Sequence, residues 1–324
     1  MRVRLTALVL LAVATVLPHA AICERWTPLA GVLHMGLASA VAHVLLHSLF
    51  FGALAAALSG FWVCERDSAA PFTPHARAWL ALLAFVGIGF VRQAGQAFVS
   101  GPRTGAETLF DFGVDGLGGA LGLIAWTLSD GARARRVARG LGWLFHPVVV
   151  APLGFFVLCW SHTGSPTLAA GWCVFVTLFE LPAVIFWLVG LRHARFSDAD
   201  ISVRHERVPL LVASAASAVM LLAATWAIHA PAVVLTSAVG ALMGAFSATA
   251  ITRWGLKISG HVGVAVAPAV ALLPDSPRAA YLFGMIALIL VWARVRDERH
   301  TPREVLGGVV LAALVAVVSF HARG

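Results

Sequence analysis

The chain has 324 residues, of which 60% are hydrophobic and only 12% are charged, and its mean hydropathy is +0.89. Soluble domains carry about 25% charged residues, so this composition excludes a water-soluble globular protein. The 23 basic and 15 acidic residues give a net charge of +8, and the basic residues lie mostly between apolar stretches. That pattern is typical of loops anchored to anionic lipid and argues against nucleic-acid binding.

Apolar stretches long enough to cross a bilayer recur along the whole chain. A span takes roughly 20 apolar residues, and a helix satisfies its backbone polar groups internally within lipid. We therefore predict an all-α, polytopic transmembrane bundle of about eleven helices. Residues 1–21 have the arginines and apolar run of a signal peptide, but we favour an uncleaved first helix because the apolar pattern soon resumes. The runs lie near 5–22, 36–63, 78–98, 107–128, 143–160, 168–191, 209–229, 231–252, 262–273, 278–293 and 304–320.

A basic segment at 131–142 separates the first four apolar runs from the other seven. We interpret this segment as a linker between a first membrane domain at 1–130 and a second membrane domain at 143–324. Its arginines are Arg133, Arg135, Arg136 and Arg139. The four cysteines of the chain stand far apart, with no CxxC pair and no metal-ligand spacing.

Three polar breaks in the second domain are predicted to lie on one face of the membrane. They fall at 192–207, 253–261 and 294–303, and two apolar runs separate each break from the next. Two crossings return a chain to the side that it left, so the three breaks share a side. The two runs before the third break look short for full spans and are interrupted by Pro274 and Pro277. A site sunk below the membrane surface would accommodate such short helices.

The first break contains Arg204 and Arg207, which share a face if the segment is helical. Two adjacent guanidinium groups suit a phosphate. Arginine-rich loops also anchor membrane proteins on the cytoplasmic side, and anchoring is the stronger interpretation of this break alone.

The second break reads WGLKISGHVGV, so Ser259 and Gly260 stand just before His261 at the start of an apolar helix. Free N–H groups at a helix N-terminus bind anions, and a histidine there can reach the same anion. Ser259 could instead be only an N-cap, with His261 an interfacial side chain. This plainer interpretation is favoured for the tripeptide alone.

The third break places Arg294 six residues before His300 and Glu304 four residues after it. One helical turn would bring the Glu304 carboxylate beside the His300 imidazole, an arrangement that orients a nucleophilic histidine. Thr301, Pro302 and Glu304 also form the capping-box start of a helix. The two interpretations are compatible.

In this order, the arginine pair, the Ser-Gly-His and the Arg-x5-His-x3-acid followed by Val-Leu-Gly-Gly resemble the three signature motifs of the type 2 phosphatidic acid phosphatase superfamily. The resemblance implies a metal-independent membrane phosphatase that uses no cofactor. His300 would attack phosphorus and form a phosphohistidine, Glu304 would orient His300, and His261 would protonate the leaving oxygen. The groups implied to hold the phosphate are Arg204, Arg207, Lys257, Ser259, Gly260 and Arg294.

The chain departs from the superfamily pattern at several motif positions. Asp200 stands where the first motif has lysine, and Val208 separates the motif arginine from its proline. Ile258 replaces the proline of the second motif, and Ala293 replaces the serine of the third. Glu304 replaces aspartate but keeps the carboxylate.

Residues 5–128 resemble the VanZ-like family, through the segment VRQAGQAFVSGPRTGAETLFDFGVDGLGGALG at 91–122 and through His47 with Phe51. That family is associated with resistance to teicoplanin and has no agreed chemistry. The intramembrane polar residues of this part of the chain could bind a ligand. They could instead form internal ion pairs beside closely packed glycines, and we favour this second interpretation. They are His43, His47, Arg92, Gln93, Gln96, Arg103, Asp111 and Asp115.

The sequence thus favours a lipid phosphate or isoprenyl (pyro)phosphate phosphatase of a bacterial cytoplasmic membrane, acting on a membrane lipid substrate. The alternative is a non-catalytic binder or transporter of a lipid-linked cell-envelope precursor that uses the same arginines. Arginine counts place the phosphatase face on the cytoplasmic side, whereas bacterial members of the superfamily usually act on the outer face. No feature of the sequence indicates a protein partner.

Overall fold

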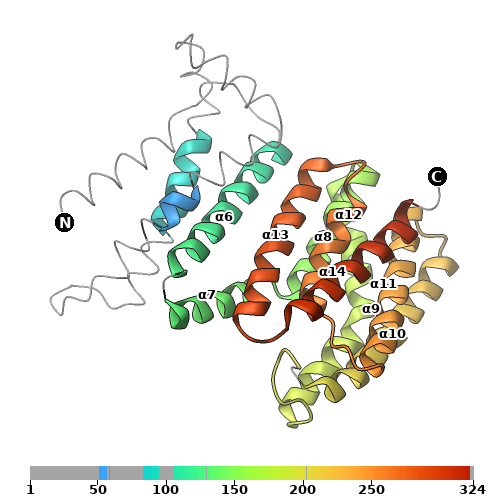
Figure 1. Ribbon diagram of the computed structural model, residues 1–324. Helices are drawn as coiled ribbons and strands as arrows, with labels where there is room; N and C mark the ends of the chain where they lie inside the picture. The colour runs from blue at the N-terminus through green and yellow to red at the C-terminus, as the bar shows by residue number, and fades with distance from the viewer. Residues whose placement is uncertain are drawn as a thin grey trace, which may run out of the picture. The chain divides into compact units, whose positions relative to one another are not determined.

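In the computed structural model, helices joined by short connections make up the part from Gly105 to His321, and Figure 1 labels them. No strand occurs among the described residues, which confirms the predicted all-α class. The predicted run at 5–22, and with it the choice between a signal peptide and a first helix, lies outside the described residues. The structure describes residues 51–56, 58, 83–94, 105–128, 130–201 and 203–321.

The labelled helices begin and end close to the limits of the apolar runs. Two further helical segments, at 51–56 and 83–94, precede them, and the whole set is consistent with the predicted total of about eleven. In chain order the labelled helices are α6 (Gly105–Thr127), α7 (Gly131–Leu144), α8 (Pro147–Thr163), α9 (Pro166–Arg192), α10 (Arg204–Ala227), α11 (Ala232–Arg253), α12 (Gly260–Ala271), α13 (Pro277–Arg296), α14 (Pro302–Ala316) and the π-helical turn η1 (Val317–His321).

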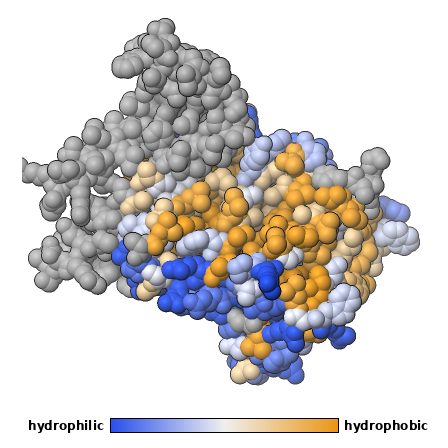
Figure 2. All heavy atoms as spheres, viewed as in Figure 1, coloured by the Kyte–Doolittle hydropathy of each residue, from blue (hydrophilic) through white to orange (hydrophobic). Residues whose placement is uncertain are grey.

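Six helices in the described part of the chain are long and apolar enough to cross a membrane. The pair formed by α7 and α8, bent by 48° at the break between them, would add a seventh span. In the second unit, hydrophobic residues gather over the middle of the helices and hydrophilic residues gather toward the end that carries the connection from α13 to α14 (Figure 2). These features are those of a multi-pass membrane protein. The exposed apolar side chains of α9 include Leu168, Val174, Leu178, Ile185 and Leu188.

The chain divides into two compact units, 1–137 and 138–324, and the division falls within α7. The segment predicted as a basic linker, 131–142, is helical. The prediction that both runs before the third break are too short to span is wrong for the second of them, because α13 has 20 residues. Pro277 stands in the first turn of α13, where a missing N–H group costs nothing, so it begins the helix instead of interrupting it.

The short helix α12 forms the centre of the second unit. It packs against α8, α13 and α14, and with 12 residues it is too short to span. Val262 and Ala265 of α12 are fully buried, as are Ile289 and Leu290 of α13. Because other helices surround it, α12 can carry a polar N-terminus into the interior of the bundle without exposing that terminus to lipid.

Two glycines allow helices to approach the start and the middle of α12. A Cβ atom on Gly308 of α14 would lie 2.6 Å from the carbonyl oxygen of Ser259, and a Cβ atom on Gly154 of α8 would lie 2.9 Å from Cγ of Pro268. Both distances are shorter than real Cβ contacts allow. Gly308 therefore lets the first turns of α14 pack directly against the segment that carries Ser259 and His261.

The first unit contains a buried ion-pair cluster in its described part. Arg92 donates from Nη1 to both carboxylate oxygens of Asp115, at 2.8 and 2.7 Å, and its Nη2 lies 3.3 Å from Oδ2 of Asp111. A Cβ atom on Gly122 would collide with the backbone of Gly52. Ion pairs beside closely packed glycines are therefore present, as we favoured, whereas His43, His47, Gln96 and Arg103 lie outside the described residues.

Replacing Gly308 by alanine is expected to destabilise the second unit. The added methyl group would meet the backbone of Ser259, so α14 must shift, and overpacking of this kind costs about 1–3 kcal/mol. The measurement is the thermal unfolding midpoint of the purified protein in one detergent. Gly284→Ala is the matched control, because a Cβ atom there meets nothing within 4 Å. An unchanged midpoint for Gly308→Ala would show that the close approach is not required.

Candidate functional site

Hydrogen bonds and close contacts join the three polar breaks to one another. Nη1 of Arg207 donates to the carbonyl of Ile258 at 2.9 Å, which ties the first break to the second. Nη2 of Arg207 lies 3.4 Å from Nε2 of His300, which ties the first break to the third. The backbone N–H of Ser259 donates to the carbonyl of Glu304 at 3.1 Å, which ties the second break to the start of α14. The three breaks therefore meet at one place.

The turn between α13 and α14 places the ring of His300 in the interior. The backbone N–H of His300 donates to the carbonyl of Arg294 at 3.1 Å, and Glu298 supports the turn with a φ of 58°. The His300 side chain has no exposed surface. His300 is thus as buried as a core residue, although it stands in a connection between two apolar helices.

Glu304 closes a capping box and also lies beside the ring of His300. Its Oε2 accepts the backbone N–H of Thr301 at 2.9 Å, and Thr301 caps Glu304 in return, so the capping box is complete. The same oxygen lies 3.3 Å from Nδ1 of His300, in a geometry that does not form a hydrogen bond. The carboxylate is therefore beside the ring, and a small rotation would align it.

The His300 ring is neutral over the whole physiological range. Burial lowers its pKa to about 2, with a further contribution from the positive charges of Arg207, Lys257 and Arg294. Burial also lowers the pKa of Lys257, and the charge of Arg207 adds to this shift. A neutral imidazole keeps a lone pair, which a nucleophilic histidine requires.

Arg207 holds the connection between α9 and α10 in place. Its Nε donates to the carbonyl of Ile201 at 2.7 Å, and its Nη2 lies 3.3 Å from the carbonyl oxygen of Asp200. Ile201 has a φ of 46°, which is a strained conformation for a β-branched residue. The guanidinium group thus stabilises a backbone conformation that would otherwise be unfavourable, and this conformation directs Asp200 inward.

Asp200 lies beside two arginines of the third break and the His261 ring of the second break. Its carboxylate oxygens are 3.2 and 3.3 Å from Nη1 of Arg294, and Oδ2 is 3.6 Å from Nε of Arg299. Its Oδ1 is 3.4 Å from Nε2 of His261. The residue that departs from the lysine of the first motif therefore supplies a negative charge at the centre of the site.

Several buried polar atoms near Asp200 have no hydrogen-bond partner. Arg294 is 3% exposed, yet its Nε and Nη2 are unpartnered, as are Nε2 of His261, Oγ of Ser259 and Nδ1 of His300. Leaving a buried polar group unsatisfied costs about 1–3 kcal/mol, and more for a charged group. The four atoms on Arg294, His261 and Ser259 can donate hydrogen bonds to an anion, so the arrangement suits a ligand with several acceptor oxygens.

The start of α12 adds backbone donors to the same region. Ser259 occupies the N-cap position, but its side chain makes no cap hydrogen bond and is buried. His261 is buried too, so the interpretation of these residues as a cap and an interfacial side chain is wrong. α12 begins at Gly260, and the first N–H groups of a helix have no intrahelical acceptor. A Cβ atom on Gly260 would meet nothing within 4 Å, which leaves room for a ligand on that side of the residue.

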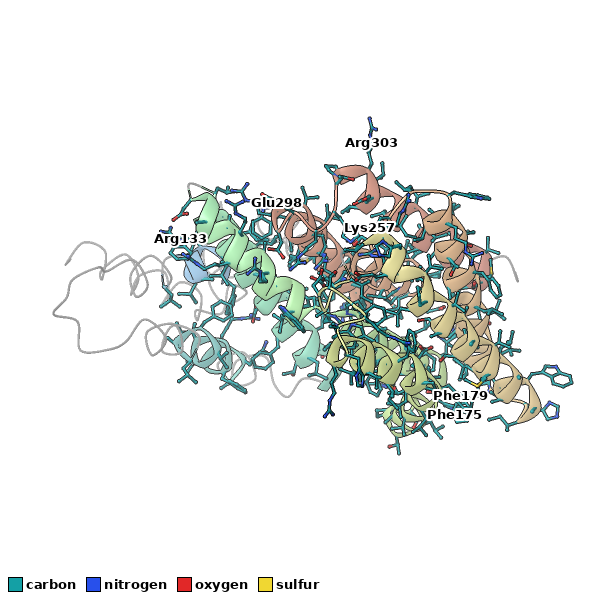
Figure 3. All side chains as sticks on the ribbon, turned by 90° about the horizontal axis from the view of Figure 1, so that it is seen from below. Arg133, Phe175, Phe179, Lys257, Glu298 and Arg303 are labelled. Atoms are coloured by element: carbon teal, nitrogen blue, oxygen red, sulfur yellow. The ribbon has the colours of Figure 1, made fainter. Side chains whose placement is uncertain are left out.

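Arg204 and Lys257 lie at the rim of the site. Arg204 is exposed and donates from Nη1 to the carbonyl of Gly255 at 3.0 Å. Lys257 donates from Nζ to the carbonyl of Arg299 at 2.8 Å, and Figure 3 shows it within the end of the bundle, whereas Arg303 points away. Of the predicted arginine pair, Arg207 therefore meets His300 and Arg204 does not join it there.

A second set of polar residues around the site was not predicted from the sequence. Asp297 lies 3.3 Å from Nη2 of Arg139 and 3.3 Å from Nε of Arg299. The alternation of acidic residues with arginines in the first and third breaks could have predicted such ion pairs. His146, which precedes α8 and contacts the His261 ring, belongs to no sequence motif that predicts its place in the site. A small pocket in this part of the second unit is lined by Arg139, Gly142, Trp143, Asp200, Arg294 and Asp297.

No protein-family model, curated protein or solved structure matches the chain.

The neutral state of His300 makes the stability of the protein depend on pH. Its pKa of about 2 in the folded protein lies below the ordinary value of 6.5, so the unfolded chain binds a proton below pH 6.5 that the folded chain does not. Stability therefore falls as pH drops through 6.5, and this ring alone accounts for a loss of about 2 kcal/mol at pH 5. Between pH 7.5 and 5.0, we expect the thermal midpoint of His300→Gln to fall less than that of the parent. Equal falls would mean that His300 is protonated in the folded protein.

Proposed function

We propose that the second unit is a membrane phosphatase of the type 2 phosphatidic acid phosphatase kind, and that it hydrolyses a lipid phosphate or isoprenyl (pyro)phosphate. The observation that carries this proposal is the convergence of a neutral, buried His300 with unpartnered donors on Arg294, His261 and Ser259. An imidazole nucleophile and a set of unsatisfied donors are the two things that phosphoryl transfer to histidine needs.

In the first step, Nε2 of His300 attacks phosphorus, and the bond from phosphorus to the leaving oxygen breaks. Glu304, 3.3 Å from Nδ1, stabilises the positive charge that the ring gains. Arg207, 3.4 Å from Nε2, faces the phosphoryl oxygens as they accumulate charge. Nε and Nη2 of Arg294, Oγ of Ser259 and the first N–H groups of α12 take the remaining oxygens, while Nη1 of Arg294 stays with Asp200.

As that bond breaks, His261 acts as the acid on the leaving oxygen. Burial, followed by the charge of Arg294, lowers the pKa of His261, so this ring takes up its proton together with an anionic substrate that offsets the nearby arginines. It gives that proton to the leaving oxygen. A water molecule then attacks the phosphohistidine, His261 accepts its proton, and the bond between nitrogen and phosphorus breaks to release phosphate.

The surroundings of the site favour a lipid substrate. The polar residues lie at the end of a unit whose helices expose apolar side chains, so a phosphate group can enter from the membrane surface while its hydrocarbon chains stay in lipid (Figure 2). We place the protein in a bacterial cytoplasmic membrane as part of the same proposal.

Two histidine variants distinguish the proposed steps. With purified protein in detergent, His300→Ala should abolish phosphate release from both phosphatidic acid and an aryl phosphate with a good leaving group. His261→Ala should lose about 100-fold or more on phosphatidic acid but much less on the aryl phosphate, because a good leaving group needs no proton. His162→Ala is the control, since that ring pairs with Asp275 away from the site.

Full activity in His300→Ala would contradict the phosphohistidine route. Retained binding of lipid-linked precursors without any turnover in the parent protein would favour the alternative of a non-catalytic binder or transporter. Parallel losses by His261→Ala on both substrates would mean that His261 does not act as the acid.

A further inference from the structure

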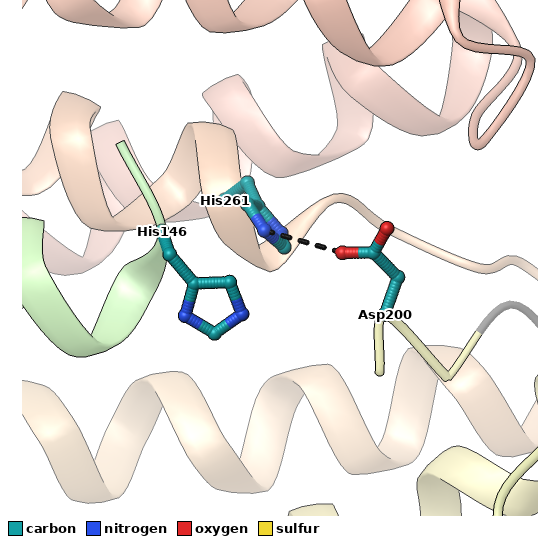
Figure 4. Close-up of side chains that lie close together, drawn as sticks. All are labelled: His146, Asp200 and His261. Atoms are coloured by element: carbon teal, nitrogen blue, oxygen red, sulfur yellow. Dashed lines mark ion pairs between the residues drawn. The ribbon is translucent and has the colours of Figure 1, made fainter. Parts of the chain in front are cut away.

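Two histidines and one carboxylate from three parts of the second unit surround a common space. His146 precedes α8, Asp200 lies in the connection from α9 to α10, and His261 stands at the start of α12. One ligand atom of each lies within 4.8 Å of the others. Figure 4 shows the two imidazoles and the carboxylate arranged around that space. Two imidazoles and a carboxylate form a frequent ligand set for divalent transition metals.

His261 supplies a second and independent observation. Its residue is 8% exposed, and Nε2 has no hydrogen-bond partner. Oδ1 of Asp200 lies 3.4 Å from that nitrogen, but the geometry is not that of a hydrogen bond. Two ligands at about 2.05 Å from a tetrahedral Zn²⁺ are separated by about 3.3 Å, so this pair already has the spacing that an ion between them requires.

The arginines beside Asp200 determine which kind of ion fits these three ligands. Arg294 already neutralises Asp200, so the site offers little net negative charge and two neutral imidazoles. Mg²⁺ and Ca²⁺ need several oxygen ligands, whereas Zn²⁺ binds imidazole nitrogen well. Oδ1 of Asp200 can hold the ion while Oδ2 remains with Arg294 and Arg299, at 3.3 and 3.6 Å. A second partner of this kind orients a ligating carboxylate.

His146 is held in position by its aromatic neighbours. Its ring stacks on those of Trp143 and Trp187, with centroid distances of 5.5 Å to each, and meets the ring of His261 edge-on at 5.0 Å. Nδ1 accepts the backbone N–H of Val148 at 3.4 Å, which leaves Nε2 for an ion. When an ion binds Nε2, the proton of the neutral ring moves to Nδ1. Nδ1 then no longer accepts the long, weak hydrogen bond from Val148.

We propose that His146, Asp200 and His261 bind a Zn²⁺-like divalent ion, and that this ion inhibits the site. The metal-free expectation drawn from the superfamily resemblance does not cover this ligand set, because His146 lies outside the motifs and Asp200 replaces the lysine of the first motif. The inhibitory effect rests on the proposed function: an ion on Nε2 of His261 removes the group that protonates the leaving oxygen. Ion binding itself is independent of any catalysis.

The binding test uses the full chain purified without a histidine tag and stripped of metal. Zn²⁺ is measured by equilibrium dialysis, and Co²⁺ by its visible absorption, which reports the coordination geometry. His146→Asn removes the imidazole but keeps an N-cap side chain for α8, Asp200→Asn keeps the shape, and His162→Ala is the control. We expect the parent and the control to bind one ion that both His146→Asn and Asp200→Asn lose, with thermal midpoints confirming that each variant is folded.

Unchanged Zn²⁺ binding in folded His146→Asn, or no such ion in the parent, would overturn the metal site. The inhibition test measures phosphate release with and without Zn²⁺. With each protein compared to itself with and without Zn²⁺, we expect Zn²⁺ to inhibit the parent and not His146→Asn. Binding without inhibition would overturn the regulatory role. Binding by a protein that releases no phosphate from any substrate would count against the proposed function while supporting the metal site.

Discussion

The site depends on the neutralisation of buried positive charge between segments that are distant in the sequence. Arg294 is almost fully buried, and a buried charge without a partner costs several kcal/mol, so the carboxylate of Asp200 has to reach it. Arg207 meets the same demand with the carbonyl oxygens of Ile201 and Ile258. Because Arg294 and Arg207 each have at least one partner in another polar break, satisfying these charges also assembles the site. The buried N-terminus of α12 is stable only inside this arrangement.

The same contacts leave a specific set of atoms unsatisfied. Gly308 lets α14 pack against Ser259, and the turn after α13 buries His300 beside Arg207. Side-chain atoms of Arg294, Ser259 and His261 remain without hydrogen-bond partners in this arrangement. Proteins rarely leave such atoms buried without a reason. A phosphate group would satisfy donors on all three residues, and a divalent ion would satisfy only the acceptor on His261. The two ligands therefore compete for one residue, which gives the site a means of regulation.

Hydropathy predicts most of the fold, because lipid requires long apolar helices and the polar breaks between them stand out. The run at 231–252 corresponds to α11, and counting crossings predicts only that the three breaks lie on one face. The parts that fail depend on tertiary contacts. Nothing local distinguishes Arg207, which faces His300, from Arg204, which faces outward. From the sequence alone, Asp200 is only a departure from the first motif, because its ion pair with Arg294 cannot be predicted. His146 reaches the site only through the bend between α7 and α8.

The most direct test of the account is to search for the covalent intermediate. The purified chain is mixed with phosphatidic acid, quenched in alkali, in which phosphohistidine survives, and analysed by peptide mass spectrometry. The account predicts a phosphoryl group on His300 that is present in the parent and absent in His300→Ala, and that accumulates in His261→Ala supplied with an aryl phosphate. Turnover without a phosphoryl group on His300, or with the group on another residue, would contradict it.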